Sequence, residues 1–404
     1  MTSSELYHIF ALEGYQTVAT RFEGRKIILE VESTKPLRCP VCNGMNVVRR
    51  GCYPRDFLAP PIGHKEVVIR WAVPRVECRD CGVVRRVRIP FASDSKRYTK
   101  RLEKYVLSLL RAATIQDVAA ISGLSWDVVK NIQKHHLNRR YRRVRLKGVK
   151  RIAIDEIAIS KGHRYLTVVL DLDSGRVLFV GDGKGADALK PFWKRVKRCK
   201  QCKVTCVAID MSPAYISAVS GNLPDAHMVF DRFHIVKLCN EMLTKLRRAL
   251  FNEATELMHK NVLKGTRWLL LKNPDNLDLS RNEARRLNEA LELNQPLATA
   301  YYMKEELRQF WEQKDKLTAG ELLYDWVYRA EASGIGLLKA FAKTVVTHRD
   351  GILAWYDDKI STGPLEGTNN KIKTMKRQAY GYRDTEFFKL KILALHETKY
   401  AFVG

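Results

Sequence analysis

The spacing of apolar residues changes twice along the chain. After His64 the stretch HKEVVIRWAVPRVEC alternates apolar and polar residues, which predicts strands. From residue 99 the spacing becomes helical, because TKRLEKYVLSLLRAA places Leu102, Val106, Leu109 and Leu110 on one helix face. From residue 150 the strand-like alternation returns. The pattern therefore predicts a strand-containing module, a helical segment and then an α/β domain.

The helical segment continues with two short helices around a glycine. Thr114 and Asp117 have the spacing of a capping box that opens a helix ending at Gly123, and Ser125 is placed to cap the next helix. Helix, glycine turn and helix form the helix-turn-helix pattern, in which the second helix enters the major groove. An ordinary helical hairpin is the alternative. The residues predicted to face DNA are Ser125, Trp126, Asp127, Lys130, Asn131 and Lys134.

A basic run follows the second helix. The stretch NRRYRRVRLKGVKR carries eight basic residues and no acid. Such a run is usually a solvated linker, but beside a helix-turn-helix it favours contact with phosphates. The residues concerned are Arg139, Arg140, Arg142 and Arg143.

The α/β segment begins with three strands joined by short turns, RIAIDEIAIS, RYLTVVLDLDSG and RVLFVGDGKG, which predict an antiparallel meander. ADALKPFWKRVK then predicts a helix, KVTCVAIDMS a buried strand, PAYISAVSG a second helix and AHMVF a fifth strand. The order βββαβαβ is that of the ribonuclease-H-like fold. Its acidic site lies where strands end.

Three carboxylates stand out in this segment. Asp155 and Asp210 lie in apolar strand context, where a carboxylate is costly unless it is paired or binds a metal. Glu156 must point to the opposite face from Asp155, because side chains alternate along a strand. Glu366 opens a helix that is otherwise basic or neutral, and a role in complementing the helix dipole is its simplest alternative. Together, Asp155, Asp210 and Glu366 predict an oxygen-rich cage for two Mg²⁺ ions.

The helix that begins near Glu366 supplies cations behind this acid. We expect these cations to hold the DNA strand that is cut. They are Lys371, Lys373, Lys376 and Arg377.

Composition supports an anionic partner. The chain has 404 residues, with 71 Lys and Arg against 44 Asp and Glu and a formal charge of +27. Such an excess favours polyanions, because neutralised phosphates release counterions. No apolar run is long enough to cross a membrane, and no secretion signal is recognisable. We therefore expect a cytoplasmic, nucleoid-associated protein without membrane contact.

Cysteines occur in spaced pairs. Cys39 and Cys42, with Cys78 and Cys81, form two C-x2-C pairs that suit tetrahedral zinc, although the gap between the pairs is longer than in common zinc ribbons. Four buried free thiols are the less favoured alternative. A further group near residue 200 has no second pair nearby and is interpreted as free thiols. It consists of Cys199, Cys202 and Cys206.

These motifs resemble the DDE transposases of bacterial insertion sequences, most closely the ISL-three family. The resemblance rests on AIDE, AIDMS, FDRFHI and GPLEGTNNKIK and covers nearly the whole chain. It implies that Asp155, Asp210 and Glu366 are catalytic, and that Asp231 and His234 belong to a D-x2-H motif beside them. It also implies a helical insertion between the second Asp and the Glu, and at least a homodimer on DNA.

The fold class expected from motifs and resemblance is α/β multidomain. A zinc-binding module (1–92) precedes a helix-turn-helix domain with its basic linker (93–149). A ribonuclease-H-like catalytic domain (150–234) is interrupted by an all-helical insertion (235–357) and completed by a C-terminal helical part (358–404).

The expected function is metal-dependent cleavage and strand transfer of double-stranded DNA, at transposon ends and target, with Mg²⁺ or Mn²⁺ and a structural Zn²⁺. A non-catalytic DNA-binding regulator derived from a transposase and a nuclease without strand transfer are the alternatives. The sequence does not separate cleavage alone from cleavage with joining, because both reactions use the same site.

Overall fold

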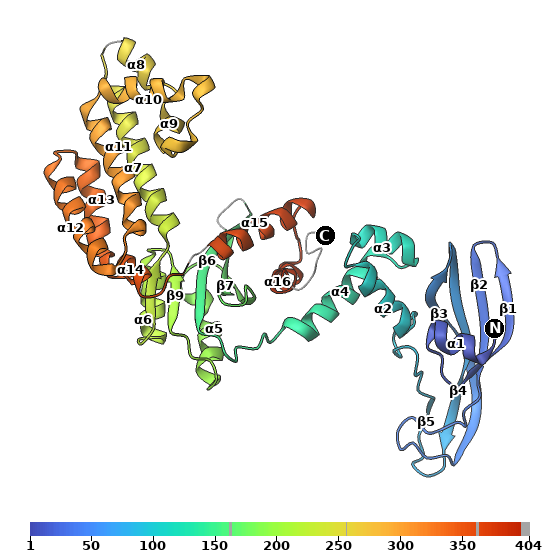
Figure 1. The fold of residues 1–404 in the computed structure, drawn as a ribbon. Coiled ribbons are helices and arrows are strands. Elements are labelled where there is room, and N and C mark those ends of the chain that lie inside the picture. Colours follow the sequence, from blue (N-terminus) through green and yellow to red (C-terminus); the bar gives the residue numbers. More distant parts are fainter. Residues whose placement is uncertain (161–163, 256, 361–362, 397–404) are drawn as a thin grey trace. The chain divides into compact units, whose positions relative to one another are not determined.

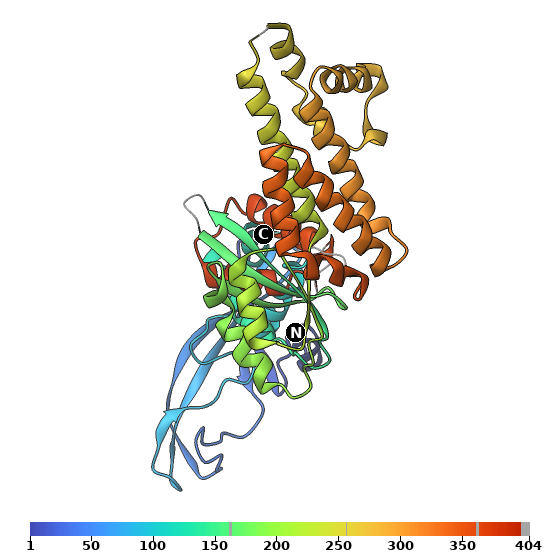
Figure 2. The same ribbon diagram turned by 90° about the vertical axis from the view of Figure 1, so that its left-hand side faces the viewer.

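The fold is taken from a computed structural model that describes residues 1–160, 164–255, 257–360 and 363–396. The chain forms two compact units, which are described separately below. The first joins Met1–Arg143 to the segment that starts at Lys371, and the second is Val144–Asn370. Figures 1 and 2 show the elements of both units in two views.

The first unit begins with a short helix and a five-stranded sheet. Helix α1 (Ser3–Phe10) precedes β1 (Tyr15–Glu23), β2 (Lys26–Ser33), β3 (Val47–Ile62), β4 (Lys65–Cys78) and β5 (Val84–Arg86). The order is β1-β2-β4-β3, with β5 on β4, and β2 runs parallel to β4. Tyr15, Phe57 and Trp71 are buried and meet the ring of Phe91 in the core. The strands predicted near residue 64 are therefore present as β4.

Three helices follow in the same unit: α2 (Lys100–Leu109), α3 (Ile115–Ser122) and α4 (Trp126–Tyr141). The predicted capping box of α3 forms between Thr114 and Asp117. Gly123 ends α3 in the left-handed region, with φ of 70°, which glycine adopts without steric cost. Ser125 occupies the N-cap position of α4, but its side chain makes no capping hydrogen bond, so the predicted cap is wrong in that detail.

The C-terminal helix α16 (Thr385–Leu393) completes the core of these three helices. Phe387 and Leu390 from its segment share one buried cluster with Leu102 and Val106 of α2 and Val129 of α4. The sequence-based boundaries assign 358–404 to the catalytic domain, whereas this packing places α16 beside the helix-turn-helix. The sequence could not show this packing, because the residues that contact the apolar face of α16 lie far from it in the chain.

The second unit contains another five-stranded sheet. Its strands are β6 (Arg151–Ser160), β7 (Arg164–Asp171), β8 (Val177–Asp182), β9 (Cys206–Ile209) and β10 (His227–Phe230). They lie in the order β10-β9-β6-β7-β8. The first three form the predicted antiparallel meander, while β9 runs parallel to both β6 and β10.

Two helices cover one face of this sheet. Helix α5 (Ala186–Arg198) connects β8 to β9, and α6 (Pro213–Asn222) connects β9 to β10. Ile152 and Ile154 of β6 share a buried cluster with Leu189 and Phe192 of α5. Since side chains alternate along β6, Asp155 points to the sheet face opposite these helices.

A helical region follows β10. Helix α7 (Arg232–Glu253) opens it, and α11 (Gln295–Gln309) and α13 (Gly336–Thr347) pack against α7. Helix α12 (Lys316–Ala332) packs against α11 and α13. Trp326 is fully buried and its indole N–H donates to the carbonyl of Met303, and Trp311 is also buried. Trp268, by contrast, is 64% exposed. The shorter helices are α8 (Leu257–Leu263), α9 (Arg267–Leu271), α10 (Glu283–Glu292) and α14 (Arg349–Leu353).

Helix α15 (Gly363–Gln378) follows this region, and the division between the two units falls within it. Among the described residues, no helix combines the length and apolarity that a membrane crossing requires.

Candidate functional site

Asp155 is the fifth residue of β6 and is largely removed from solvent. Its Oδ1 accepts a hydrogen bond from the backbone N–H of Glu156 at 2.7 Å. The side chain of Glu156 lies on the other face of the sheet, where the Tyr215 hydroxyl of α6 is 3.5 Å from its Oε2. The two neighbouring acids therefore have separate environments, as the alternation of β6 predicts.

Asp210 follows the last residue of β9 and belongs to the turn that leads into α6. Its Oδ1 accepts a hydrogen bond from the backbone N–H of Ser212 at 3.0 Å. Asp155 and Asp210 are close enough for the charge of one to act on the other. This proximity follows from the topology, because β6 and β9 are parallel neighbours.

The environment of Asp155 disfavours its charge. Burial raises the pKa of the Asp155 carboxyl, and the negative charge of Asp210 acts in the same direction. Hydrogen bonds from the Glu156 backbone and Asn369, together with nearby His234, act against this rise. A carboxylate held in such surroundings favours a positive partner.

Helix α15 brings an amide to Asp155. Asn369 Nδ2 donates to Asp155 Oδ2 at 2.6 Å, across 214 positions of sequence. The other amide atom of Asn369, Oδ1, is buried and has no hydrogen-bond partner among the described residues. A buried oxygen without a partner calls for an explanation, and a bound cation is one.

Glu366 lies in the first turn of α15 and is exposed. It precedes Asn369 by three positions, and residues three apart on a helix share a face. The bond between Asn369 and Asp155 therefore ties the helix that carries Glu366 to β6, while the side chain of Glu366 itself is exposed.

Asp231 and His234 occupy the start of α7. Asp231 caps this helix by accepting from the Phe233 N–H at 2.9 Å, and its Oδ2 lies 3.9 Å from His234 Nε2. The backbone N–H of Asp231 also donates to the carbonyl of Ile209, next to Asp210. His234 is close enough to Asp155 to act on its charge. Both members of the D-x2-H motif thus border the two aspartates.

The ligand atoms of Asp155, Asp210 and Glu366 do not all lie within 4.8 Å of one another in the part of the chain that is described. Their joint action as a metal site therefore stays a prediction. The chemistry of the donors suits Mg²⁺, because three carboxylates and the free Oδ1 of Asn369 are hard oxygen ligands.

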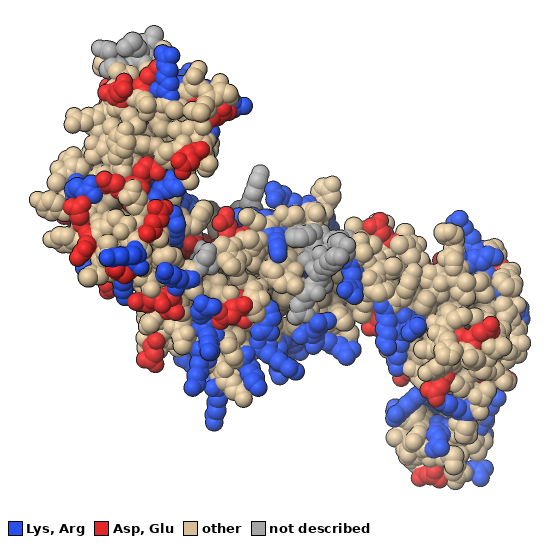
Figure 3. Space-filling view, viewed as in Figure 1, with Lys and Arg blue, Asp and Glu red and all other residues tan. Residues whose placement is uncertain are grey.

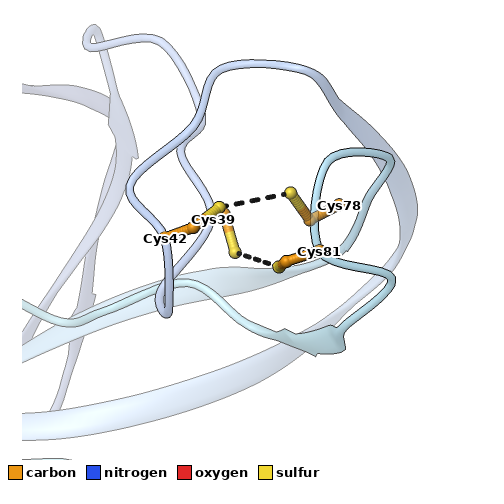
Figure 4. A group of neighbouring side chains, drawn as sticks. All are labelled: Cys39, Cys42, Cys78 and Cys81. Atoms are coloured by element: carbon orange, nitrogen blue, oxygen red, sulfur yellow. Dashed lines mark hydrogen bonds between the residues drawn. The ribbon is translucent and has the colours of Figure 1, made fainter.

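Four cysteines do converge (Figure 4), and their sulfur atoms all lie within 4.8 Å of one another. Cys39 Sγ lies 3.6 Å from Cys81 Sγ, and Cys42 Sγ lies 3.5 Å from Cys78 Sγ. Thiolates about 2.3 Å from a tetrahedral zinc lie roughly 3.8 Å apart, so the group fits this metal. Backbone N–H groups, first that of Cys42 and then that of Val41, lower the pKa of Cys39 to about 6 and favour its thiolate. The pKa values of Cys42 and Cys81 are raised, because the backbone N–H groups of Gly44 and Val83 are outweighed by burial and by the neighbouring thiols. Cys52 is exposed on β3 and outside the group.

The predicted DNA-facing helix α4 has two distinct sides. Lys130 and Lys134 are half-buried and bind the carboxylate of Asp384, at 3.2 Å and 2.8 Å. Asp384 also caps α16 by accepting from the Phe387 N–H at 3.0 Å. Asn131, by contrast, is exposed. The two lysines thus serve an internal contact, and the exposed side of α4 is left for a partner.

The other predicted DNA contacts lie at the surface. Lys376 is half-buried, and the remaining residues are exposed: Ser125, Trp126, Arg139, Arg140, Arg142, Arg143, Lys371, Lys373 and Arg377.

Sequence reasoning missed Asn369 and Asp384. Asn369 could have been found from its i+3 spacing after Glu366, which places both residues on one helix face. Asp384 precedes a helical segment in the manner of an N-cap, but its pairing with Lys134 spans 250 positions and has no local signal.

Comparisons with known proteins agree with this organisation. Residues 35–81 match the zinc-finger of the transposases of IS204, IS1001, IS1096 and IS1165, and residues 87–137 match the helix-turn-helix domain of transposase family ISL3. Residues 152–392 match a family described as transposase.

Relatives that match over most of the chain are also described as transposases. The chain is 37% identical over 339 residues to the transposase for insertion sequence element IS1001 of Bordetella parapertussis, covering 83% of this chain and 82% of the relative. It is 28% identical over 390 residues to the transposase for IS1557 of Mycobacterium tuberculosis, covering 90% and 87%.

Proposed function

Because the chain belongs to the ISL3 family of transposases, we propose that it cleaves DNA at the terminal inverted repeats of its own element and joins the ends to a target. The observation that carries the proposal is the bond from Asn369 to Asp155. It ties the helix of Glu366 to the strand of Asp155, beside Asp210. Three acids scattered along the sequence thereby become candidates for one site.

Asp155, Asp210 and Glu366 are the proposed ligands of two Mg²⁺ or Mn²⁺ ions. When bound, such a pair activates the attacking oxygen and stabilises the leaving oxygen of a phosphodiester. Asn369 holds one oxygen of Asp155, which fixes the rotation of that carboxylate. His234 lies beside it and would counter the negative charge that two aspartates concentrate. No side-chain nucleophile is required, since water and a 3′-hydroxyl can each attack in line.

The proposed architecture of the second unit is a ribonuclease-H-like domain with a helical insertion. Its support is the sheet order β10-β9-β6-β7-β8, with an antiparallel meander followed by two parallel strands. The helices from α7 to α14 would be the insertion, since they separate the strand of Asp210 from the helix of Glu366.

DNA recognition is proposed for the zinc-finger and helix-turn-helix regions. The exposed side of α4, with Trp126 and Asn131, would read base edges in the major groove. The basic run that includes Arg139 and Arg142, and the cations of α15, would contact phosphates. We expect the protein to act on the nucleoid in the cytoplasm as a dimer or larger assembly that pairs two ends.

One experiment tests the proposal against its alternatives. The protein is incubated with Mg²⁺, a terminal-repeat duplex and a plasmid, and both cut and joined products are measured. Parent protein should give both products. Asp155→Asn should retain repeat binding and lose cleavage by at least about 10³-fold, the equivalent of several kcal/mol of metal-dependent stabilisation.

Each alternative predicts a different outcome. A nuclease would give cut ends without joined products. A regulator would bind the repeat and give neither product. Retained cleavage by Asp155→Asn would remove Asp155 from the site.

A further inference from the structure

A strongly basic surface lies at α5. Its first three cations, Arg145, Lys147 and Lys150, belong to the basic run that is already proposed to contact phosphates, whereas the cations of α5 and of the turn after it have no role in that proposal. It is made by the chain before β6, by α5 and by the turn between α5 and β9. Figure 3 shows basic side chains gathered over α5. This α5 surface consists of eight exposed cations: Arg145, Lys147, Lys150, Lys194, Lys197, Arg198, Lys200 and Lys203.

The three segments are held together by defined contacts. Arg195 of α5 donates to the carbonyl of Val144 at 2.6 Å, and the N–H of Gly148 donates to the carbonyl of Gln201 at 3.0 Å. The N–H of Thr205 donates to the carbonyl of Lys150 at 2.8 Å. The cations therefore belong to one built surface within the second unit.

The folding of α5 and its turn directs these cations outward. Leu189, Phe192 and Val196 face the core, which leaves Lys194 and Lys197 on the outer side of α5. In the following turn, the half-buried thiols of Cys199 and Cys202 pack against the same core. The C-x2-C pair thus anchors a turn whose lysines are exposed, which gives these two thiols a packing role.

The positive charges of the surface have no acidic residues beside them in the sequence to neutralise them. The segments 143–154 and 188–209 contain no Asp or Glu. Within the described ranges, none of the eight cations forms a salt bridge. Eight unpaired cations repel one another, and a polyanion would relieve that repulsion while releasing its own counterions.

The location separates this surface from the catalytic acids. Lys150 precedes the start of β6 and Lys203 precedes β9, whereas Asp155 lies within β6 and Asp210 follows the end of β9. Five residues of extended chain from Lys150 to Asp155 span about 16 Å, at roughly 3.3 Å per residue. A duplex on the surface would therefore be held several phosphates away from the cleaved bond.

We propose that the α5 surface binds the phosphate backbone of duplex DNA without reading its sequence. This inference rests on the proposed function and extends it to DNA outside the terminal repeat, either the flank or the target. Lysine and arginine on an exposed helix and turn supply charge to phosphates but no defined base contact.

The test compares two triple variants with the same change of net charge. Lys197→Gln/Lys200→Gln/Lys203→Gln removes part of the surface. The matched control, Lys245→Gln/Lys339→Gln/Lys343→Gln, removes three exposed lysines from α7 and α13. Affinity is measured by fluorescence anisotropy between about 50 and 200 mM salt, without Mg²⁺. The probes are an unrelated duplex, a flanked repeat, an unflanked repeat and a single-stranded RNA.

The surface variant should reduce the slope of log K against log salt by about 2–3, from roughly 0.9 per lost phosphate contact. The control should change it by less than about 1. A matching Lys→Arg triple at the surface positions should keep the parent slope and shows that charge is the cause. If the slope falls only for the flanked repeat, the surface binds DNA that flanks the repeat. If the slope also falls for the unrelated duplex, the surface binds target DNA.

Equal slopes for parent and surface variant, or equal losses in variant and control, would overturn the proposal. So would a loss of binding to single-stranded RNA with duplex binding unchanged. Because the assay involves no cleavage, its result is independent of the Asp155→Asn experiment. The two proposals can therefore fail separately.

Discussion

Asn369 donates a hydrogen bond of 2.6 Å to Asp155, although 214 positions separate them in the chain. The bond joins α15 to the central strand of the second sheet. It occupies one carboxylate oxygen of Asp155 and leaves the Oδ1 of Asn369 buried and without a partner among the described residues. Asn369 is therefore placed to position Asp155 for the proposed reaction.

Replacing Asn369 by Ala should slow DNA cleavage by about 10–100-fold, the usual effect of losing a group that orients a metal ligand. It should also raise the Mg²⁺ concentration needed for half-maximal cleavage, because Asp155 loses its fixed orientation. Cleavage of a labelled terminal-repeat duplex across a Mg²⁺ series measures both effects.

The matched control is Asn370→Ala, which changes the exposed neighbour on the same helix. It should retain the parent rate and Mg²⁺ dependence. An Asn369→Ala protein with the parent rate and Mg²⁺ dependence would show that the hydrogen bond has no part in the reaction.

Zinc binding should depend on Cys78 and be independent of Cys52. Cys78→Ser removes one of four converging thiolates, and structural zinc contributes about 10–16 kcal/mol to the folding of small zinc peptides. We expect the variant to lose its zinc, measured by metal analysis, and to become protease-sensitive within residues 35–81. Cys52→Ser should keep one zinc per chain, and zinc loss from this control would contradict the assignment.

Asp384 should stabilise α16 and its contact with α4. Asp384→Ala removes the N-cap bond to Phe387 and the partner of Lys130 and Lys134, so we expect a local loss of about 1–2 kcal/mol. Hydrogen exchange of amides in α16 measures this loss directly. Unchanged exchange in α16 would mean that apolar packing alone holds the helix.

The same carboxylate predicts a dependence on pH. Burial raises the pKa of Asp384, but hydrogen bonds from Lys134, the Phe387 backbone and Lys130 outweigh burial and lower this pKa to about 2. A lowered pKa means that the stabilisation is present above the ordinary Asp value of 3.8 and is lost as pH falls toward 2. Protection of α16 in the parent should therefore fall over this range, and Asp384→Ala should show no such step.

The exposed side of α4 should carry sequence preference. Asn131→Ala should reduce the discrimination between the terminal repeat and a base-substituted repeat by about 1–3 kcal/mol, if Asn131 contacts a base edge. Lys134→Ala should change discrimination less, because Lys134 is already bound to Asp384. Anisotropy titrations with both duplexes measure this difference, and equal discrimination by parent and Asn131→Ala would exclude a base contact.

Local sequence signals predicted much of the fold. Alternation identified β6, and apolar runs bounded by turn residues identified β7 and β8, which are buried along most of their length. The Thr114 and Asp117 pair identified the start of α3 because capping is a local interaction. The C-x2-C pairs identified the four cysteines that converge for the same reason, since each pair is one tight turn.

Relationships between distant segments could not be predicted in this way. The apolar face of α16 gives no indication that it packs with Leu102 of α2, and the boundary at residue 358 misses this contact. The ion pairs that Lys130 and Lys134 form with Asp384 were also missed. The residues around a surface lysine do not indicate whether its ammonium group binds a DNA phosphate or a carboxylate from a distant part of the chain. Asn369 lay within a quoted motif, but its contact with Asp155 required the sheet to be known.

The position of α16 imposes an order on biosynthesis. The ribosome releases the helices around Leu102 and Val129 long before it adds Phe387 and Leu390, which fill the space between them. A nascent or prematurely terminated chain would therefore present an incomplete helix-turn-helix region with apolar side chains open to water. A chain that ends before Phe387 cannot close that gap, so premature stop codons would impair the proposed DNA recognition as well as the proposed strand breakage.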